Sequence, residues 1–142
     1  MKVFFDTNVY VAEALLGSAA EKMLATTVKA RWRIFVSGYV LDETYRVLTK
    51  KFALSQRFAR LTRERIRRRA VLVAPPVSGH RVPNDPADGP VLRAALASGA
   101  DLLVTNDAHL LVLNPFQGLK ITSMTDYFDF LVDEGYIERS AD

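Results

Sequence analysis

The chain has 142 residues, the usual length of one folded domain, of which 49% are hydrophobic and 25% charged, as in ordinary globular proteins. No apolar run approaches the ~20 residues that a membrane-spanning helix needs. The N-terminus lacks the pattern of a secretory signal, and without cysteine there is no disulfide or thiolate metal site. We therefore expect a cytoplasmic protein with a single domain over residues 1–142.

Short apolar β-rich runs alternate with helical patterns along the chain. Strands are expected at residues 3–5, 33–36, 71–74, 102–105 and 120–122. Helices are expected at residues 9–30, 37–52, 55–69 and 89–98, and after the capping-box pattern at residues 123–126. The first helix is expected to break at Gly17, with Ser18 capping its second half, and the Pro-rich residues 75–86 form a loop. This alternation predicts an α/β fold with a parallel sheet covered on both faces.

The charge is unevenly distributed. The net charge is +3, yet residues 57–69 carry seven arginines and only one acid, Glu64. Such a block is either a solvated helix face or a surface that faces a polyanion, and the sequence leaves both readings open.

Two aspartates stand where predicted strands end. Asp6 follows the run at residues 3–5, and Asp107 follows the run at residues 102–105. In an open parallel sheet this carboxyl edge is where ligands bind. Each aspartate is also a good helix N-cap, so neither one alone indicates a functional site. Thr105 and Asn106, just before Asp107, are able to hydrogen-bond a carboxylate or a phosphate.

Glu43 is expected on the apolar face of the helix at residues 37–52. Val40, Glu43 and Val47 share that face. A carboxylate placed there needs a partner, because an unpaired buried charge is costly. The partner is either an arginine or a metal ion. The neighbouring Asp42 is expected to face water and to pair with Arg46 four residues later.

A fourth acid, Asp88, opens the helix at residues 89–98. Asp88 stands one turn before Leu92 and two turns before Ala95, on the side expected to face the sheet. Asp85, three residues earlier, is followed by proline and is typical of a turn. If Asp6, Glu43, Asp88 and Asp107 meet, their repulsion is severe unless a cation lies among them. Clustered carboxylates bind Mg²⁺ or Mn²⁺, which promote phosphodiester cleavage.

Four segments of the chain, taken together, resemble the PIN domain, a nuclease domain found in many bacterial and archaeal toxins of toxin–antitoxin systems. They are Asp6-Thr7-Asn8, Leu41-Asp42-Glu43, Asp85-Pro86-Ala87-Asp88 with the Ala-rich helix after it, and Gly99-Ala100-Asp101-Leu102-Leu103-Val104-Thr105-Asn106-Asp107. The last is the most specific. Gly89 departs from the subgroup's usual pattern, which often has Asn there, and lacks the polar side chain that Asn would offer to a substrate.

The resemblance implies a three-layer α/β/α sandwich with a five-stranded parallel sheet, often assembled as a homodimer. It implies a ribonuclease that uses Mg²⁺ or Mn²⁺ to cleave single-stranded RNA, and for toxin members a small antitoxin partner. The family's acidic quartet maps onto Asp6, Glu43, Asp88 and Asp107. Its helper groups map onto Thr7, Asn8 and Thr105.

The hypothesis for the reaction assigns a role to each acid. Asp6 is the central metal ligand, and Asp88 and Asp107 complete the site partly through water. Glu43 binds a second metal or orients the attacking water. The alternative is a PIN-like module without catalysis that binds RNA or a protein.

Two other classes of protein also begin with a strand that ends in Asp, but this sequence fits them less well. An aspartate-nucleophile phosphatase needs a second aspartate two residues after Asp6, where this chain has Asn8, and a response-regulator receiver needs an adjacent acidic pair. His80 and His109 lack the spacing of a zinc site.

Overall fold

Five parallel strands form one sheet in the computed structural model, which describes residues 1–74 and 89–138. The strand order is β3-β2-β1-β4-β5. The strands are β1 (Lys2–Phe5), β2 (Arg33–Ser37), β3 (Val71–Val73), β4 (Leu102–Val104) and β5 (Lys120–Thr122). All five lie within a residue or two of the expected positions, and every pairing is parallel.

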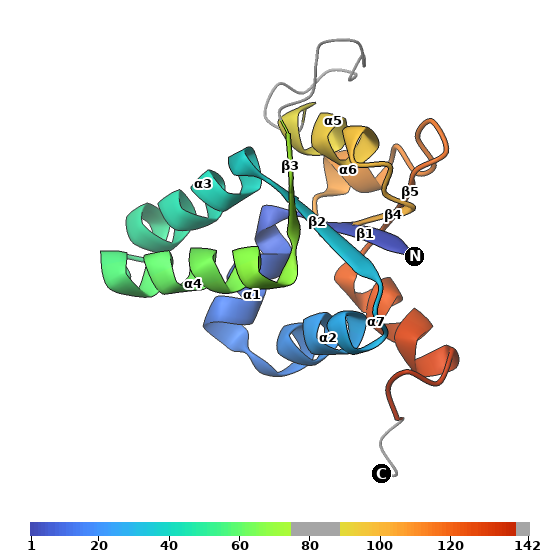
Figure 1. Ribbon diagram of the computed structural model, residues 1–142, viewed down its shortest axis with the longest axis horizontal. Helices are drawn as coiled ribbons and strands as arrows, with labels where there is room; N and C mark the ends of the chain where they lie inside the picture. Colours follow the sequence, from blue (N-terminus) through green and yellow to red (C-terminus); the bar gives the residue numbers. More distant parts are fainter. Residues whose placement is uncertain (75–88, 139–142) are drawn as a thin grey trace.

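Helices cover the sheet on both faces. They are α1 (Thr7–Leu16), α2 (Ser18–Lys29), α3 (Gly38–Arg46), the π-helical segment η1 (Val47–Lys51), α4 (Gln56–Arg69), α5 (Gly89–Ala97), α6 (Ala108–Leu111) and α7 (Met124–Asp133). Figure 1 shows α5 and α6 on one side of the sheet and α1, α2 and α7 on the other. The expected three-layer α/β architecture is therefore confirmed.

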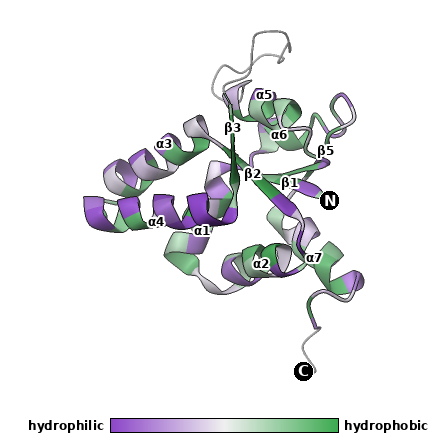
Figure 2. Cartoon of the chain, in the orientation of Figure 1, coloured by the Kyte–Doolittle hydropathy of each residue, from purple (hydrophilic) through white to green (hydrophobic). Residues whose placement is uncertain are grey.

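The central strands are buried because both of their faces are covered. Phe4 and Phe5 are fully buried, and the Phe5 ring meets Tyr10 of α1 and Tyr127 of α7 edge-on, at 6.1 and 5.8 Å between ring centroids. A strand buried on both faces reads as a continuous apolar run. Figure 2 shows this contrast, with hydrophobic residues on the strands and a hydrophilic α4.

Two local expectations were wrong. Gly17, with φ +73°, is the N-cap of α2, and Ser18 is the first helical residue and makes no cap. The helix predicted over 37–52 is confirmed in its extent, although its geometry changes at Val47 from α to π. Asp42 faces water as expected, but its ion-pair partner is Arg63 at 3.9 Å, whereas Arg46 approaches Glu43 at 4.0 Å. Glycine adopts a positive φ at little steric cost, which explains why the helix breaks at Gly17.

The loop expected at 75–86, Asp85, Asp88 and His80 all lie outside the described residues. Within residues 1–74 and 89–138, no helix is both long enough and apolar enough to cross a membrane.

A buried ion pair fastens α1 to α4. Both nitrogens of the Arg69 guanidinium fork donate to Glu13, at 2.7 and 2.8 Å, and the Glu13 side chain is only 3% exposed. Planar two-point pairing of this kind is the strongest arginine–carboxylate geometry. Because Asp6 immediately precedes α1, this contact also helps to fix the residues at the sheet edge.

We expect Glu13→Gln to lower the free energy of unfolding by about 3 kcal/mol, because it leaves the charge of Arg69 without its partner in a largely buried position. Urea unfolding followed by circular dichroism measures the change. Glu64→Gln is the matched control, since the Glu64 side chain is 54% exposed and lies 3.9 Å from the exposed Arg68, and it should cost less than about 1 kcal/mol. Equal effects of the two substitutions would contradict this account.

Candidate active site

The pairing of β1 with β4 brings Asp6 and Asp107 to the same edge of the sheet. Phe5 is opposite Val104 in the parallel register, and the Asp6 backbone N–H donates to the Val104 carbonyl at 3.0 Å. The chain therefore leaves both strands side by side at their carboxyl ends, the edge at which open α/β sheets bind ligands.

The Thr105 hydroxyl joins the two strand ends. Its Oγ1 donates to Asp6 Oδ2 at 2.8 Å and accepts the Asp107 backbone N–H at 3.0 Å. Asn8 Nδ2 adds longer contacts, 3.4 Å to Asp6 Oδ2 and 3.3 Å to Thr105 Oγ1. These contacts hold the Asp6 carboxylate in one orientation although it comes from a different strand than Thr105.

Asp6 is nearly buried and faces other acids. The residue is 7% exposed, and its Oδ1 accepts the Thr7 backbone N–H at 2.7 Å as the N-cap of α1. Burial raises the pKa of Asp6, the hydrogen bonds from Thr105 and Thr7 lower it, and the charges of Glu43 and Asp107 raise it again, with a net upward shift. Asp6 is thus both a helix cap and a carboxylate in a negative environment. These are the two roles that the sequence left open for it, a helix N-cap and a ligand-binding group at the sheet edge.

Glu43 projects from α3 toward the same region. Its side chain is 27% exposed, and one oxygen lies 4.0 Å from Arg46 Nη2. Tyr39, one turn earlier, donates a hydrogen bond to Glu43; burial, this bond and the charge of Glu43 raise the pKa of Tyr39 to about 12. The arginine contact is long and the arginine is exposed, so it screens the Glu43 charge only weakly.

Asp107 and Asn106 fix the start of the elements that follow. Asp107 is the N-cap of α6 and accepts the His109 backbone N–H at 2.9 Å. Asn106 Oδ1 accepts the backbone N–H of Met124, the first residue of α7, at 3.0 Å, and its own N–H donates to Asn8 Oδ1 at 3.3 Å. Asn106 is therefore a structural link between the sheet edge and α7.

Asp6, Glu43 and Asp107 line one cleft of about 520 Å³. Thr7 and Asn8 also line it, together with Lys51 from η1 and apolar residues of α1. Thr7 Oγ1 is buried and has no hydrogen-bond partner within the described part of the chain. The cleft thus combines carboxylates with a cation, which are suited to binding a metal ion and a phosphate group.

Three of the four predicted acids share this cleft, and the fourth, Asp88, lies outside the described residues. Across residues 1–74 and 89–138, no group of three or more His, Cys, Asp or Glu side chains is close enough to hold a metal ion. The described residues therefore provide the charge and the ligand type of a cation site without a complete coordination cage.

Sequence reasoning missed Tyr39 and Lys51. Tyr39 stands four residues before Glu43, a spacing at which side chains meet on a helix, so the signal was present. Lys51 reaches the cleft from the π-helical segment, and no sequence pattern predicted that change of helical geometry.

Comparison with known proteins gives one family. The family model described as the PIN domain matches residues 2–109, which include every predicted site residue. No curated protein matches the chain.

We expect Asp6→Asn to raise the free energy of unfolding at pH 7 in the presence of chelator. The folded-state pKa of Asp6 lies above the ordinary value of 3.8, so its contribution to stability is fully present below pH 3.8 and is lost as pH rises through the folded pKa. The advantage of Asp6→Asn should shrink as the pH falls from 7 toward 3.8.

Urea unfolding of both proteins across this pH range measures the difference, with Asp42→Asn on the exposed face of α3 as the control. A stability gap that stays constant or widens on acidification would show that Asp6 is not destabilised by ionisation.

Proposed function

This chain belongs to the PIN domain family, and from that membership we propose that it is a metal-dependent endoribonuclease that cleaves single-stranded RNA. PIN domains are generally nucleases. The observation that carries the proposal is the cleft in which Asp6, Glu43 and Asp107 converge from three separate elements. Such convergence imposes electrostatic repulsion, which a site that binds no cation has no reason to maintain.

The donor chemistry of the cleft fits Mg²⁺ or Mn²⁺. All three acids offer hard oxygen ligands, and the negative charges that raise the pKa of Asp6 favour a divalent cation in the same place. We propose that Asp6, Asp107 and the sequence-predicted Asp88 hold the ion, and that Glu43 holds a second ion or orients water. Bound there, such an ion lowers the pKa of a coordinated water and stabilises charge on the phosphate.

The chain's own groups position the reactants. Thr105 and the Thr7 N–H keep the Asp6 oxygens in a fixed orientation, so that little reorganisation is needed when substrate arrives. We propose that Glu43, which is hydrogen-bonded by Tyr39 and partly exposed, accepts a proton from the attacking water. We propose that Lys51, which lines the cleft, contacts the phosphate oxygens.

The charge distribution supports a polyanionic substrate. The arginines of α4 form a hydrophilic face (Figure 2), and Arg57, Arg60 and Arg67 lie exposed on it. Several other arginines of this helix are engaged with acids, as in the Arg69–Glu13 and Arg63–Asp42 pairs. We infer that the exposed arginines contribute a sequence-independent attraction for RNA phosphates.

We further propose that the chain acts as the toxin of a toxin–antitoxin pair, with a small antitoxin as partner and with a second copy of the chain in a homodimer. The support is the resemblance of its motifs to toxin members of the family. Growth arrest on expression of the chain, relieved by a neighbouring open reading frame that encodes a small DNA-binding protein, tests this role. Normal growth under strong expression would count against it.

We expect the purified chain to cleave unstructured RNA with Mn²⁺ or Mg²⁺ and to be inactive in chelator. Glu43→Gln should lower the rate by about a hundredfold or more, because metal-assisted catalysis supplies several kcal/mol and 1.36 kcal/mol is a factor of ten. Asp42→Asn is the matched control, since Asp42 is adjacent in sequence but 82% exposed, and it should cleave as the wild type does.

Single-stranded DNA of the same sequence is assayed in parallel to test the preference for RNA. Cleavage that persists in chelator, or full activity of Glu43→Gln, would contradict the mechanism. RNA binding without cleavage would instead support a module that has lost catalysis.

A further inference from the structure

A second cavity lies beside the acidic cleft at the same edge of the sheet. It has a volume of about 700 Å³ and is lined by residues from the ends of β2 and β3, the first turn of α3, and α5. Ser37 and Val73, which are paired in register at the carboxyl ends of β2 and β3, both line it. Since the sheet order is β3-β2-β1-β4-β5, this cavity is next to the strand ends that carry Asp6 and Asp107.

Helices α3 and α5 line both the cavity and the cleft. Helix α3 contributes Gly38 and Tyr39 to the cavity and Glu43 to the cleft, and α5 contributes Arg93 to the cavity and Val91 to the cleft. The hydrogen bond from Tyr39 to Glu43 links the two spaces directly. One turn of helix, about 5.4 Å along the axis, separates these two side chains, a step that one nucleotide of an extended strand can span.

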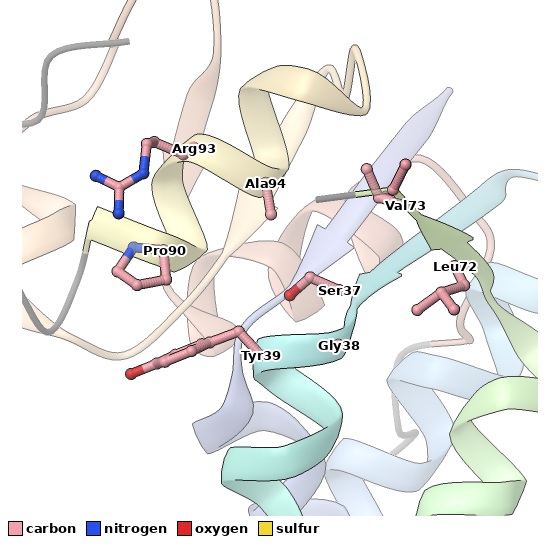
Figure 3. Close-up of a pocket in the computed structure, with 9 residues that line it drawn as sticks. Ser37, Gly38, Tyr39, Leu72, Val73, Pro90, Arg93 and Ala94 are labelled. Carbon is pink, nitrogen blue, oxygen red and sulfur yellow. The ribbon is translucent and has the colours of Figure 1, made fainter. Parts of the chain in front are cut away.

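The lining is mainly apolar, with a few groups of defined polarity. Leu72, Val73 and Pro90 supply aliphatic surface, and Tyr39 supplies an aromatic ring. Figure 3 shows the Tyr39 ring and the Arg93 side chain extending to the same side of the cavity, with Pro90 between them. An apolar hollow of several hundred Å³ with one aromatic ring and one guanidinium is typical of a small-molecule or base-binding site.

We propose that this cavity binds the base of the nucleotide next to the scissile phosphate, with Tyr39 as the stacking surface and Arg93 as the contact to the flanking phosphate. The inference rests on the proposed ribonuclease function, which it deepens by assigning a substrate position. Aromatic stacking accepts any base because every base has a π-face. Arginine pairs with phosphate through its planar fork of donors. The cavity therefore favours a nucleotide unit over an isolated anion or a purely apolar group.

The test uses an unstructured oligoribonucleotide whose cleavage site has been mapped, together with two versions that carry an abasic ribose on either side of that site. For the wild type we expect one abasic substrate to raise KM about tenfold. Tyr39→Ala and Arg93→Gln should raise KM on intact RNA by a similar factor. For Tyr39→Ala, the abasic position should raise KM no further. Tyr39→Phe keeps the ring and should keep KM near the wild-type value, while its loss of the Glu43 hydrogen bond lowers kcat.

The matched control is Arg31→Gln, which removes the same charge just before β2, at the opposite end of the strands. It should leave KM unchanged. The inference is overturned if the wild type cleaves both abasic substrates with unaltered KM, or if Tyr39→Ala remains as sensitive to the abasic position as the wild type, and in both cases the ribonuclease function stands.

A protein that cleaves no RNA would overturn the proposed function instead. Fluorescence anisotropy with the same labelled oligonucleotides in chelator then tests separately whether the cavity binds a base. Weaker binding of one abasic version by the wild type, but not by Tyr39→Ala, supports the subsite, and equal dissociation constants for all versions overturn it.

Discussion

The arrangement of the site depends on one electrostatic constraint, the enclosure of the Asp6 carboxylate among other acids. Asp6 is almost fully buried, its hydrogen bonds come from Thr7, Thr105 and Asn8, and its charge is opposed by those of Glu43 and Asp107. The hydrogen bonds favour the ionised form, while burial and the neighbouring charges oppose it, and the net result is a raised pKa. A carboxylate held in one orientation under unfavourable charge is well suited to accept a divalent cation.

The topology of the sheet creates this enclosure. Placing β1 beside β4 puts Asp6 next to Thr105, whose hydroxyl contacts both Asp6 and the Asp107 N–H. Helix α3, which follows β2 on the other side of β1, brings in Glu43. The buried Glu13–Arg69 pair on α1 and α4 ties the helix that Asp6 caps to the rest of the molecule. The site is therefore assembled from elements that are distant in sequence but fixed by parallel strand pairing.

The sequence predicted the parts of the site that follow from strand and helix periodicity. Asp6 and Asp107 were placed correctly because an apolar run followed by a polar residue marks the end of a buried strand, and Glu43 because of its position relative to Val40. The partner of Arg46 was mispredicted because its long side chain reaches acids both three and four residues away, and local spacing does not distinguish Glu43 from Asp42.

Other features depended on tertiary context. The π-helical segment that brings Lys51 to the cleft has no signature in residue type. The cavity beside Tyr39 arises from β3 and α5, which meet only in the folded chain. Gly17, and not Ser18, is the N-cap of α2 because the backbone turns with a positive φ at Gly17 and the helix begins at the next residue. The preference of serine for the N-cap position does not decide where the helix begins.

The most direct test of the central claim is calorimetric titration of the metal-free protein with Mn²⁺. The account predicts saturable binding at neutral pH that is abolished by Asp6→Asn, weakened at least tenfold by Asp107→Asn, and unaffected by Asp42→Asn. Manganese binding of equal affinity in the wild type and in Asp6→Asn, or no binding to the wild type at millimolar Mn²⁺, would contradict the claim that these acids form a cation site.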